Sequence, residues 1–526
     1  PLDVYIVPDS SEITLLGDRN FKFNGKVVAG NFEYIGHDYT FLYDSFLVNL
    51  NVIDSVKLFL SQGGGSRKKQ IDNVLEGSNN IDKEEGVTTD ISGSSGVLYI
   101  NRPDNKSSRE KLPNYPNFDA GTGAIVRFNR KEVFNGVYGN SIYFDLPPFK
   151  IDSLNDSDPS AINFAGSFVS SGMFPVFEEE LHVRDDHSLG FYHEVPAEGY
   201  QLFQGHGKLT GDITLNKKGL RSNGRIDFLS TSVESNDFIF YPDSVTASGS
   251  FAEIRREVHD GVDFPQANLQ NYSMKWMPKK DSMYLWNNSE PFQFYDNTAT
   301  LDGQAIVSNG GVFGTGTMQT RGSEVISENY TLQGDKFAAR HSEFSIKTED
   351  PEKPALFGDD VRLRFNLAEN YADISPEVQG ETAISFPYAQ FKTSIPNARW
   401  DLNEQKIRMT KPENVALENS LFYTTRKDLD SLRFNATSAE YDIRSQELKV
   451  MGIPYIIVAD AKITPENNEV LILENSKIGT LYNTTIILDT LNGYHQLKNG
   501  VIDIISRNEF SGHATYLYKN ALDQVY

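Results

Sequence analysis

The sequence feature that most constrains the fold of this chain is a short segment that occurs twice without a gap. Residues 438–450 read SAEYDIRSQELKV, and residues 397–409, 41 positions earlier, read NARWDLNEQKIRM. In both copies apolar and polar side chains alternate on either side of a polar centre, which is the period of a β-strand with one covered face. Each copy therefore predicts a strand–turn–strand unit. A single hairpin of this length is not stable in water, so the repeat predicts a stack in which neighbouring units cover one another.

Further repeats extend the pattern over much of the chain. Residues 264–285 match residues 386–409 once two residues are inserted, and residues 24–45 align without a gap on residues 223–244. The second pair shares an Asn-Gly dipeptide near its start and an Asp-Ser dipeptide at its end. Asp and Ser hydrogen-bond to their own backbone in turns, so the Asp-Ser dipeptides at 9–10, 44–45 and 243–244 are expected to end strands.

Other segments predict local departures from the hairpin pattern. Residues 452–463 (GIPYIIVADAKI) are apolar at successive positions, which predicts a strand covered on both faces. Asn-Gly at 492–493 and at 499–500 predicts two tight turns. Residues 62–119 are rich in Gly, Ser, Asn, Pro and charge, so we expect a loop-rich insertion with a short helix over Arg67 to Leu75.

These patterns together predict an all-β protein, built as an elongated array of short antiparallel hairpins. The hairpins would stack as a two-layer sheet, either folded over in a jellyroll or taco-like manner or wound like a solenoid. We expect four parts: a β-repeat unit at 1–61, the insertion at 62–119, repeat units of the first type at 120–250, and a hairpin array of the second type at 251–526.

Composition excludes several functional classes. The chain has 49 basic and 72 acidic residues, a net charge of −23 that repels phosphate backbones, so no nucleic-acid partner is expected. There is no cysteine, which excludes disulfides and thiolate metal sites. No run of 18 apolar residues is present to predict a membrane-spanning helix. The chain starts with neither Met nor a signal peptide, so we expect a segment of a longer chain or a processed one.

Two polar segments are candidate metal sites. In HVRDDHSLGFYHEV, His187 and His193 could share a strand face with a carboxylate at a metal, although a solvated charged hairpin explains the same letters. DSLNDSDPS at 152–160 is rich in oxygen ligands but lacks the Gly and Glu of an EF-hand loop. Nucleophile-elbow, P-loop and dinucleotide motifs are missing. We therefore predict no cofactor, no metal and no catalysis.

The remaining feature is the repeated apolar face. It is interpreted first as an ordinary sheet core. The functional alternative is an apolar groove, open along one edge, that holds acyl chains. The side chains that would line it are Trp276, Trp400, Tyr441, Ile443, Leu448, Val450, Ile456 and Val458.

One stretch of the chain resembles a known family. Residues 438–472, SAEYDIRSQELKVMGIPYIIVADAKITPENNEVLI, are similar to the repeat of the OstA-like lipopolysaccharide-transport bridge proteins. There, too, an Ala-acid-Tyr-Asp opening leads through a turn to Leu-x-x-x-Gly, an apolar strand and another turn. The resemblance, which extends at best over 264–518, implies a periplasmic taco-like stack with a lipid-carrying groove. It implies that Tyr441, Ile443, Leu448 and Val450 line that groove. The chain as a whole looks like a segment of a very large envelope protein of Bacteroidota.

The sequence therefore predicts a non-catalytic scaffold or bridge in the periplasm or at the outer membrane of a Gram-negative bacterium. Its expected partners are other envelope proteins or the rest of a longer chain, and lipid carriage is the sharper form of the hypothesis. The first alternative is a structural subunit of an outer-membrane secretion or assembly complex. The second is a surface carbohydrate-binding or adhesion module, and a β-helix-type enzyme is the third.

Overall fold

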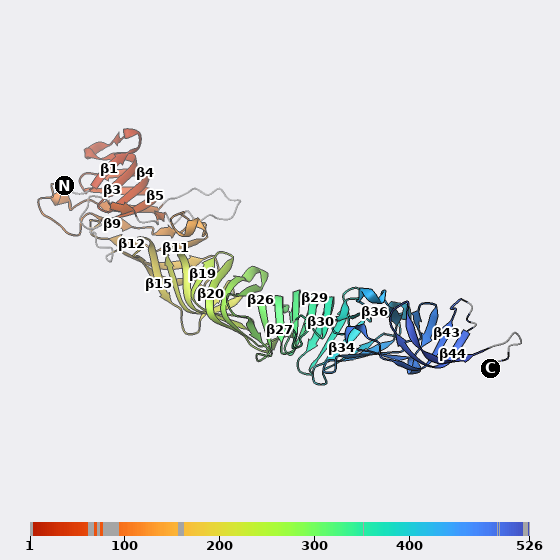
Figure 1. Cartoon of the computed structure of the whole chain (residues 1–526). Coiled ribbons are helices and arrows are strands. Elements are labelled where there is room, and N and C mark those ends of the chain that lie inside the picture. Colours follow the sequence, from red (N-terminus) through yellow and green to blue (C-terminus); the bar gives the residue numbers. More distant parts are fainter. Residues whose placement is uncertain are drawn as a thin grey trace. The chain divides into compact units, whose positions relative to one another are not determined.

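The structure is a computed structural model that describes residues 4–61, 68–70, 74–76, 94–155, 162–350, 352–491, 493, 495–518 and 524. These residues form antiparallel β-strands joined by turns, which confirms the predicted all-β class (Figure 1). The described part contains no helix that is long and apolar enough to cross a bilayer. Its helical turns are three-residue 3-10 turns: η1 Asp9–Ser11, η2 Gly17–Arg19, η3 Pro103–Asn105, η4 Phe134–Gly136, η6 Pro278–Lys280, η7 Leu417–Asn419, η8 Lys427–Leu429, η9 Glu466–Asn468 and η10 Glu474–Ser476.

The chain divides into two compact units. Unit 1 comprises Pro1–Phe228, Ser232–Ser250 and Ser273–Ser282, and unit 2 comprises Leu229–Thr231, Phe251–Tyr272 and Met283–Tyr526. The repeat types predicted from the sequence, with boundaries at 61, 119 and 250, remain a prediction.

The strands of unit 1 are β1 (Val4–Pro8), β2 (Thr14–Leu15), β3 (Phe21–Ala29), β4 (Phe32–Leu42), β5 (Leu47–Ser61), β6 (Lys68–Gln70), β7 (Val74–Glu76), β8 (Ser94–Tyr99), β9 (Asn117–Ala120), β10 (Ala124–Arg127), β11 (Ile142–Leu146), β12 (Phe149–Ile151), β13 (Asn163–Ser170), β14 (Phe177–Val183), β15 (Leu189–Glu194), β16 (Tyr200–Leu202), β17 (Gly207–Asn216) and β18 (Gly219–Phe228). Strands with residues in both units are β19 (Thr231–Tyr241), β20 (Ser244–Ile254), β23 (Ala267–Met277) and β24 (Ser282–Asn287).

The strands of unit 2 are β21 (Glu257–His259), β22 (Val262–Phe264), β25 (Phe292–Phe294), β26 (Ala299–Ser308), β27 (Gly311–Thr320), β28 (Ser323–Leu332), β29 (Lys336–Ile346), β30 (Leu356–Asn366), β31 (Tyr371–Pro376), β32 (Ile384–Phe386), β33 (Phe391–Thr393), β34 (Asn397–Asp401), β35 (Lys406–Thr410), β36 (Leu421–Thr424), β37 (Arg433–Asn435), β38 (Ser438–Asp442), β39 (Glu447–Met451), β40 (Ile456–Val458), β41 (Ala461–Thr464), β42 (Glu469–Ile472), β43 (Leu481–Leu488), β44 (His495–Ile504) and β45 (Phe510–Leu517).

Strand β5 organises the first part of unit 1. It pairs with β4 along most of its length, and its last residues pair with β6. It also pairs with β7 and β8. The predicted helix at 67–75 is therefore wrong where the structure describes it, because the backbone groups of β6 and β7 are used in sheet pairing; residues 67 and 71–73 lie outside the described residues. Tertiary pairing has overridden local propensity.

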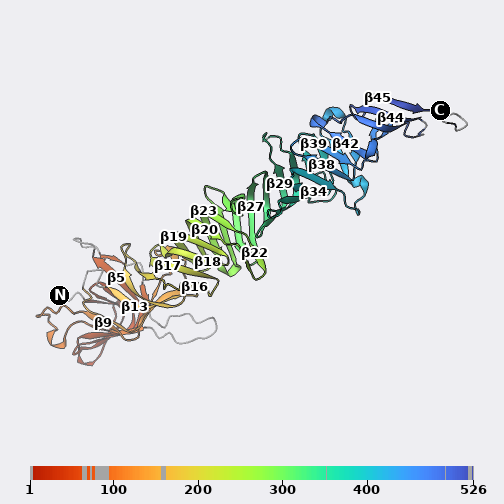
Figure 2. The same cartoon turned by 90° about the horizontal axis from the view of Figure 1, so that it is seen from below.

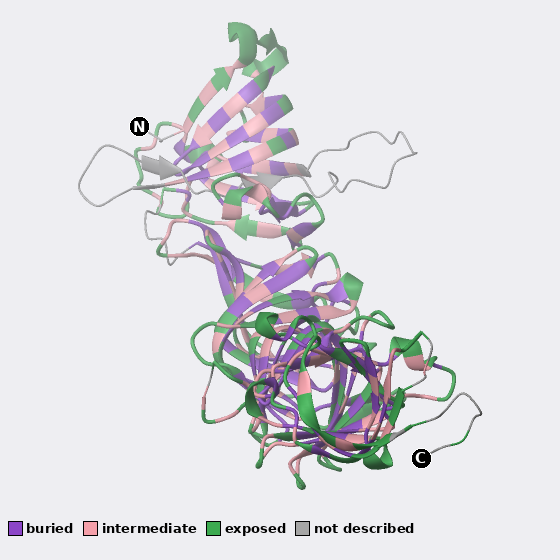
Figure 3. Cartoon of the chain, turned by 45° about the vertical axis from the view of Figure 1, so that its right-hand side comes forward, coloured by how far each residue is buried: buried purple, intermediate pink, exposed green. Residues whose placement is uncertain are grey.

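Burial alternates along the strands of unit 1, as the period of two requires. In β3, Val27 and Ala29 are fully buried while their neighbours are partly exposed, and Tyr34 of β4 is fully buried opposite Val27. Figure 3 shows this alternation as coloured bands across β-strands. The core of the unit is thus formed by one face of each strand.

The shared Asn-Gly dipeptides of the sequence repeat lie inside strands rather than in turns. Gly25 in β3 and Gly224 in β18 have φ values of +133° and +155°. A Cβ at Gly224 would lie 2.1 Å from the carbonyl oxygen of Thr210, so the two strands approach too closely there for any other residue. At Gly25 the register of β3 against β4 also shifts, as at a β-bulge.

An Asn-Gly dipeptide inside a strand also explains one wrong turn prediction near the C-terminus. Asn499 and Gly500 lie within β44, where the register shifts against β45, and Asn499 has a φ of +51°. Gly493 does lie in the turn between β43 and β44, where its N–H donates to the carbonyl of Asp489; Asn492 is outside the described residues. The Asp-Ser dipeptides at 9–10, 44–45 and 243–244 all lie where one strand ends and the next element begins, as predicted.

Unit 2 begins as a meander and then splits into two sheets. Strands β26 to β30 pair in sequence. The second half of β30 pairs with β31, which leads through β34, β35, β38 and β39 to β42, and its first half pairs with β32, which leads through β33 and β36 to β37. Figure 2 shows β34, β38, β39 and β42 side by side. The repeated hairpins are confirmed, with Ala398 opposite Met409 and Ala439 opposite Val450.

The two sheets of unit 2 enclose an apolar core. The ring of Tyr441 in β38 lies 5.0 Å from that of Phe386 in β32, centroid to centroid.

The last sheet, β40–β41–β43–β44–β45, corrects another prediction. Ile456 and Val458 of β40 are buried, but Ile457 between them is 42% exposed, so this strand is covered on one face only. The second face of this strand is exposed to solvent although its side chains are apolar.

Candidate functional site: an arginine-lined sheet face

The side chains predicted to line a groove are mostly buried in the structure. Seven of the eight are at most 1% exposed: Trp276, Trp400, Tyr441, Leu448, Val450, Ile456 and Val458. Ile443 is half-buried and lies in the turn between β38 and β39, where its N–H donates to the carbonyl of Gln405. The strand face predicted for Ile443 thus ends one residue earlier.

The structure brings part of this set together. Trp400, Tyr441, Leu448 and Val450 lie on the inner face of the sheet that contains β34, β38 and β39. Trp276 belongs to unit 1, where it packs against Phe203 and Phe228 with ring centroids 5.6 and 5.5 Å away.

Side chains fill the interior at these positions. The indole of Trp400 lies 6.1 Å from the ring of Phe365 and 6.2 Å from that of Phe344. Burial raises the pKa of the Tyr441 hydroxyl well above its usual range, and neither this hydroxyl nor Nε1 of Trp400 has a hydrogen-bond partner among the described residues. The repeated apolar face is therefore buried, and at Tyr441 it contacts Phe386 of the other sheet.

The polar cluster at 182–194 forms a hydrogen-bonded chain in unit 1. One ring nitrogen of His193 lies 2.9 Å from a carboxylate oxygen of Glu179, and the other lies 2.8 Å from the hydroxyl of Tyr200. The imidazole stacks on Phe177 at 3.9 Å. His187 lies in the preceding turn.

The described residues contain no group of three or more His, Cys, Asp or Glu side chains placed to hold a metal ion. Of the oxygen-rich segment at 152–160, residues 156–160 lie outside the described residues.

The most distinctive polar surface is the outer face of the sheet in unit 2 that contains β29, β30, β31, β34, β35, β38 and β39. Period-two alternation places the apolar residues of these strands inward and their charged residues outward. The sheet register aligns one row of outward side chains from β30 to β39: Arg364, Asp373, Arg399, Arg408, Glu440 and Lys449. We call Arg340, Arg362, Arg364, Arg399 and Arg408 the arginine face.

Acidic neighbours fix the positions of several of these arginines. Arg399 donates from Nε and a terminal nitrogen to the two oxygens of Asp373, at 2.6 and 2.9 Å, and lies 4.2 Å over the ring of Tyr371. Arg408 donates to Glu440 at 3.2 Å and is also paired with Glu404. Such paired guanidinium groups are held in fixed orientations.

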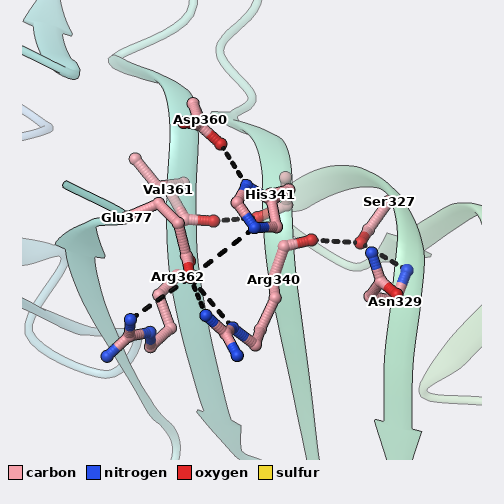
Figure 4. A network of polar contacts seen from close by, with 9 residues as sticks. Ser327, Asn329, Arg340, His341, Asp360, Val361, Arg362 and Glu377 are labelled. Atoms are coloured by element: carbon pink, nitrogen blue, oxygen red, sulfur yellow. Dashed lines mark hydrogen bonds and ion pairs between the residues drawn. The ribbon is translucent and has the colours of Figure 1, made fainter.

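A buried carboxylate holds two more. Oε1 of Glu377 accepts hydrogen bonds from Arg340, at 2.9 Å from Nε, and from Arg362, at 3.2 Å (Figure 4). The Glu377 side chain is 4% exposed. Burial alone would raise its pKa, but the hydrogen bonds from the two guanidinium groups outweigh that effect and lower the pKa to about 2. His341, between Asp360 and Glu377 in the same view, completes the network.

The network is positioned by a break in strand pairing. His341 and Asp360 have φ values of +47° and +53°, and the register of β29 against β30 shifts between Ala339 and Phe344. The N–H of Glu377, just after β31, donates to the carbonyl of Asp360. The bulge thus brings a residue from the end of β31 over β29 and β30.

Two hollows open on this face, with volumes of about 670 and 550 Å³. Arg362 and Arg364 line both of them. The first hollow extends over β26 to β30 and the second over β30, β31, β34 and β35. Volumes of this size are typical of ligand sites.

Sequence reasoning missed this face. The signal was present in VRLRFN, where Arg362 and Arg364 alternate with apolar residues, and in NARWD and KIRMT, which place Arg399 and Arg408 at outward positions. The register that joins these strands into one surface could not be predicted from the sequence.

No match was found when the chain was compared with models of known protein families, with curated proteins and with solved structures.

Proposed function

We propose that this protein is a non-catalytic scaffold or bridge in the periplasm or at the outer membrane of a Gram-negative bacterium. It would hold other envelope proteins, or further parts of a longer chain, in place through its sheets. The observation that carries the proposal is the closed interior of unit 2. With the inner faces packed on each other, the outer faces and the strand edges are what such a protein offers to partners. The envelope location rests on the resemblance of residues 438–472 to OstA-like repeats.

The packed interior favours a scaffold over a lipid conduit. A groove for acyl chains needs apolar side chains that a lipid can reach. Trp400 and Tyr441 are at most 1% exposed, and the ring of Tyr441 contacts that of Phe386 in the other sheet, so a lipid would have to separate the two sheets. Exchanging those contacts for acyl contacts gains little free energy, because both are apolar.

A strand edge supports the proposed mode of binding. β45 pairs with β44, and no other described strand pairs with its second edge. Tyr516 on this strand is 44% exposed. Unpaired edges bind a further strand through main-chain hydrogen bonds, which is a common way to join β proteins. A structural subunit of a secretion or assembly complex would use the same edge.

Site-specific photo-crosslinking in the cells that make the full chain tests the proposal. A photoreactive phenylalanine replaces Tyr516 at the edge, or Ile326 as the control. Ile326 is 43% exposed, but its strand β28 is paired on both sides by β27 and β29. We expect discrete protein adducts from position 516 and few from position 326.

Lipid analysis of the same purified protein supplies the contrary outcome. Native mass spectrometry should find no stoichiometric lipid on the scaffold. Stoichiometric acyl lipid together with no protein adduct from position 516 would overturn the scaffold in favour of a conduit.

A further inference from the structure

We propose that the arginine face of unit 2 binds a carboxylate-bearing polysaccharide, with Arg364 as its main anchoring residue. This inference concerns the outer face only and does not depend on the proposed scaffold function.

The first argument is that Arg364 is exposed and has no hydrogen-bond or ion-pair partner among the described residues. The register places it beside Ala338 on one side and Asp373 on the other. Both oxygens of Asp373 already accept from Arg399, so this carboxylate is engaged elsewhere. A guanidinium group surrounded by fixed neighbours, itself unpaired, is ready to take a carboxylate in a two-pronged hydrogen bond.

The second argument is the charge surplus beside it. Glu377 supplies one negative charge to the two guanidinium groups of Arg340 and Arg362. Nε of Arg362 is buried and has no partner among the described residues. Arg362 and Arg364 are two positions apart on β30 and therefore point to the same side of the sheet. Glu328 also lines the first hollow, so Glu328 and Glu377 together leave one positive charge unbalanced among Arg340, Arg362 and Arg364, beside the place where the two hollows meet.

The third argument concerns the shape and the chemistry of the lining. Two hollows that share Arg362 and Arg364 suit a chain of linked units better than one small anion. The second hollow offers hydroxyl and amide groups from Ser375, Asn397 and Thr410, which suit sugar hydroxyls. The first offers apolar surface from residues that include Ile306, Phe313 and Ala338, which suits the carbon face of a sugar ring.

The small number of unpaired guanidinium groups favours a carboxylated glycan over a phosphate polymer. Most guanidinium groups here are already paired with carboxylates, and the whole chain carries a net charge of −23. A nucleic acid or polyphosphate binds mainly through contacts with many free cations, and it meets too few unpaired guanidinium groups here. A polyuronate carries planar carboxylates separated by neutral hydroxyls, which matches isolated arginines among polar groups.

Calorimetric titration of the full chain with oligogalacturonate of defined length tests the inference. The fully methyl-esterified form of the same oligomer is the ligand control. The variant is Arg364→Gln, and its protein control is Arg321→Gln, which removes an equal charge from an exposed turn of unit 2 that lines neither hollow. Circular dichroism checks that both variants keep the fold.

We expect the wild type and Arg321→Gln to bind the free acid alike. Arg364→Gln should weaken binding about tenfold or more, as the loss of a charged hydrogen-bond pair predicts, and esterification should abolish it. Equal weakening by Arg321→Gln would reduce the effect to general charge and overturn the site. Absence of binding to the free acid would do the same. Tighter binding of polyphosphate that is lost in Arg364→Gln would overturn the assignment to a glycan.

Discussion

Replacing Trp400 tests whether the repeated apolar face is a packed core or an accessible groove. The indole is 1% exposed and lies between the rings of Phe344 and Phe365. Burying roughly 200 Å² of aromatic surface contributes about 5 kcal/mol at 25 cal/mol per Å². Nε1 of the indole has no partner among the described residues, which offsets about 1 kcal/mol or more of that gain. Trp400→Ala should therefore destabilise unit 2 by about 3 to 4 kcal/mol, within the usual range for such changes.

Trp400→Phe is the matched variant. It keeps an aromatic ring in the core and removes the unpaired N–H, so we expect a change of no more than about 1 kcal/mol. The two units need not unfold together, so the assay is hydrogen exchange read by mass spectrometry, with peptides from β34 and β35 as the probe and peptides from β17 and β18 of unit 1 as the internal reference. A loss below about 1 kcal/mol for Trp400→Ala would refute the packed core, because a side chain that lines an open groove can be truncated at little cost.

Three further predictions address the site and the strands. Glu377 has a pKa lowered from 4.5 to about 2, so the stability that it contributes should be present above pH 4.5 and lost as the pH falls towards 2. Glu377→Gln should therefore lower the free energy of unfolding by about 2 kcal/mol at pH 7, allowing for solvent screening of the guanidinium groups. Near pH 2 the same substitution should cost almost nothing, and urea unfolding at the two pH values measures both costs. Gly303→Ala should lower the stability by about 2 kcal/mol or more, because Gly303 has a φ of +151° and the new Cβ would lie 2.1 Å from a carbonyl oxygen. Gly310→Ala in the adjoining turn is the control and should be close to neutral. Equal melting temperatures for the two variants would contradict this prediction. Val458→Lys should cost about 3 kcal/mol or more and Ile457→Lys less than about 1 kcal/mol, and similar losses for both in thermal unfolding would argue against a strand covered on one face.

The hairpin part of the fold was predictable because each unit contains its own evidence. Alternation at Ala439 and Tyr441, a polar turn, and renewed alternation at Leu448 and Val450 specify two strands and their covered face without knowledge of neighbours. Prediction from local sequence failed where the same dipeptide is compatible with two different local structures. Asn499–Gly500 can form a hairpin turn or a mid-strand bulge, since both need a backbone with positive φ, and the pairing partner decides between them.

The arginine face could not be predicted for a related reason. Arg399 and its partner Asp373 are 26 residues apart, on strands that are not consecutive in the chain, because β32 and β33 lie between β31 and β34 in sequence. Only the split at β30, which sends alternate segments into different sheets, makes β31 and β34 neighbours. A surface built from such pairs is a property of the register, and the sequence carries no short-range record of it.

The alternation of apolar and polar side chains along each strand produces both the inner and the outer face of unit 2. This alternation links the proposed scaffold function with the proposed binding of a glycan to the outer face. Each strand that places Trp400 or Tyr441 in the core must turn its neighbours, such as Arg399 and Glu440, outward. Packing the inner face removes it from contact with ligands. Pairing successive strands in register then repeats the outward side chains at the strand spacing of about 4.8 Å, so that charges accumulate in rows. A hairpin repeat that closes its core therefore presents a periodic outer surface, and a polymer with periodic charges is the kind of ligand that such a surface can bind along its length.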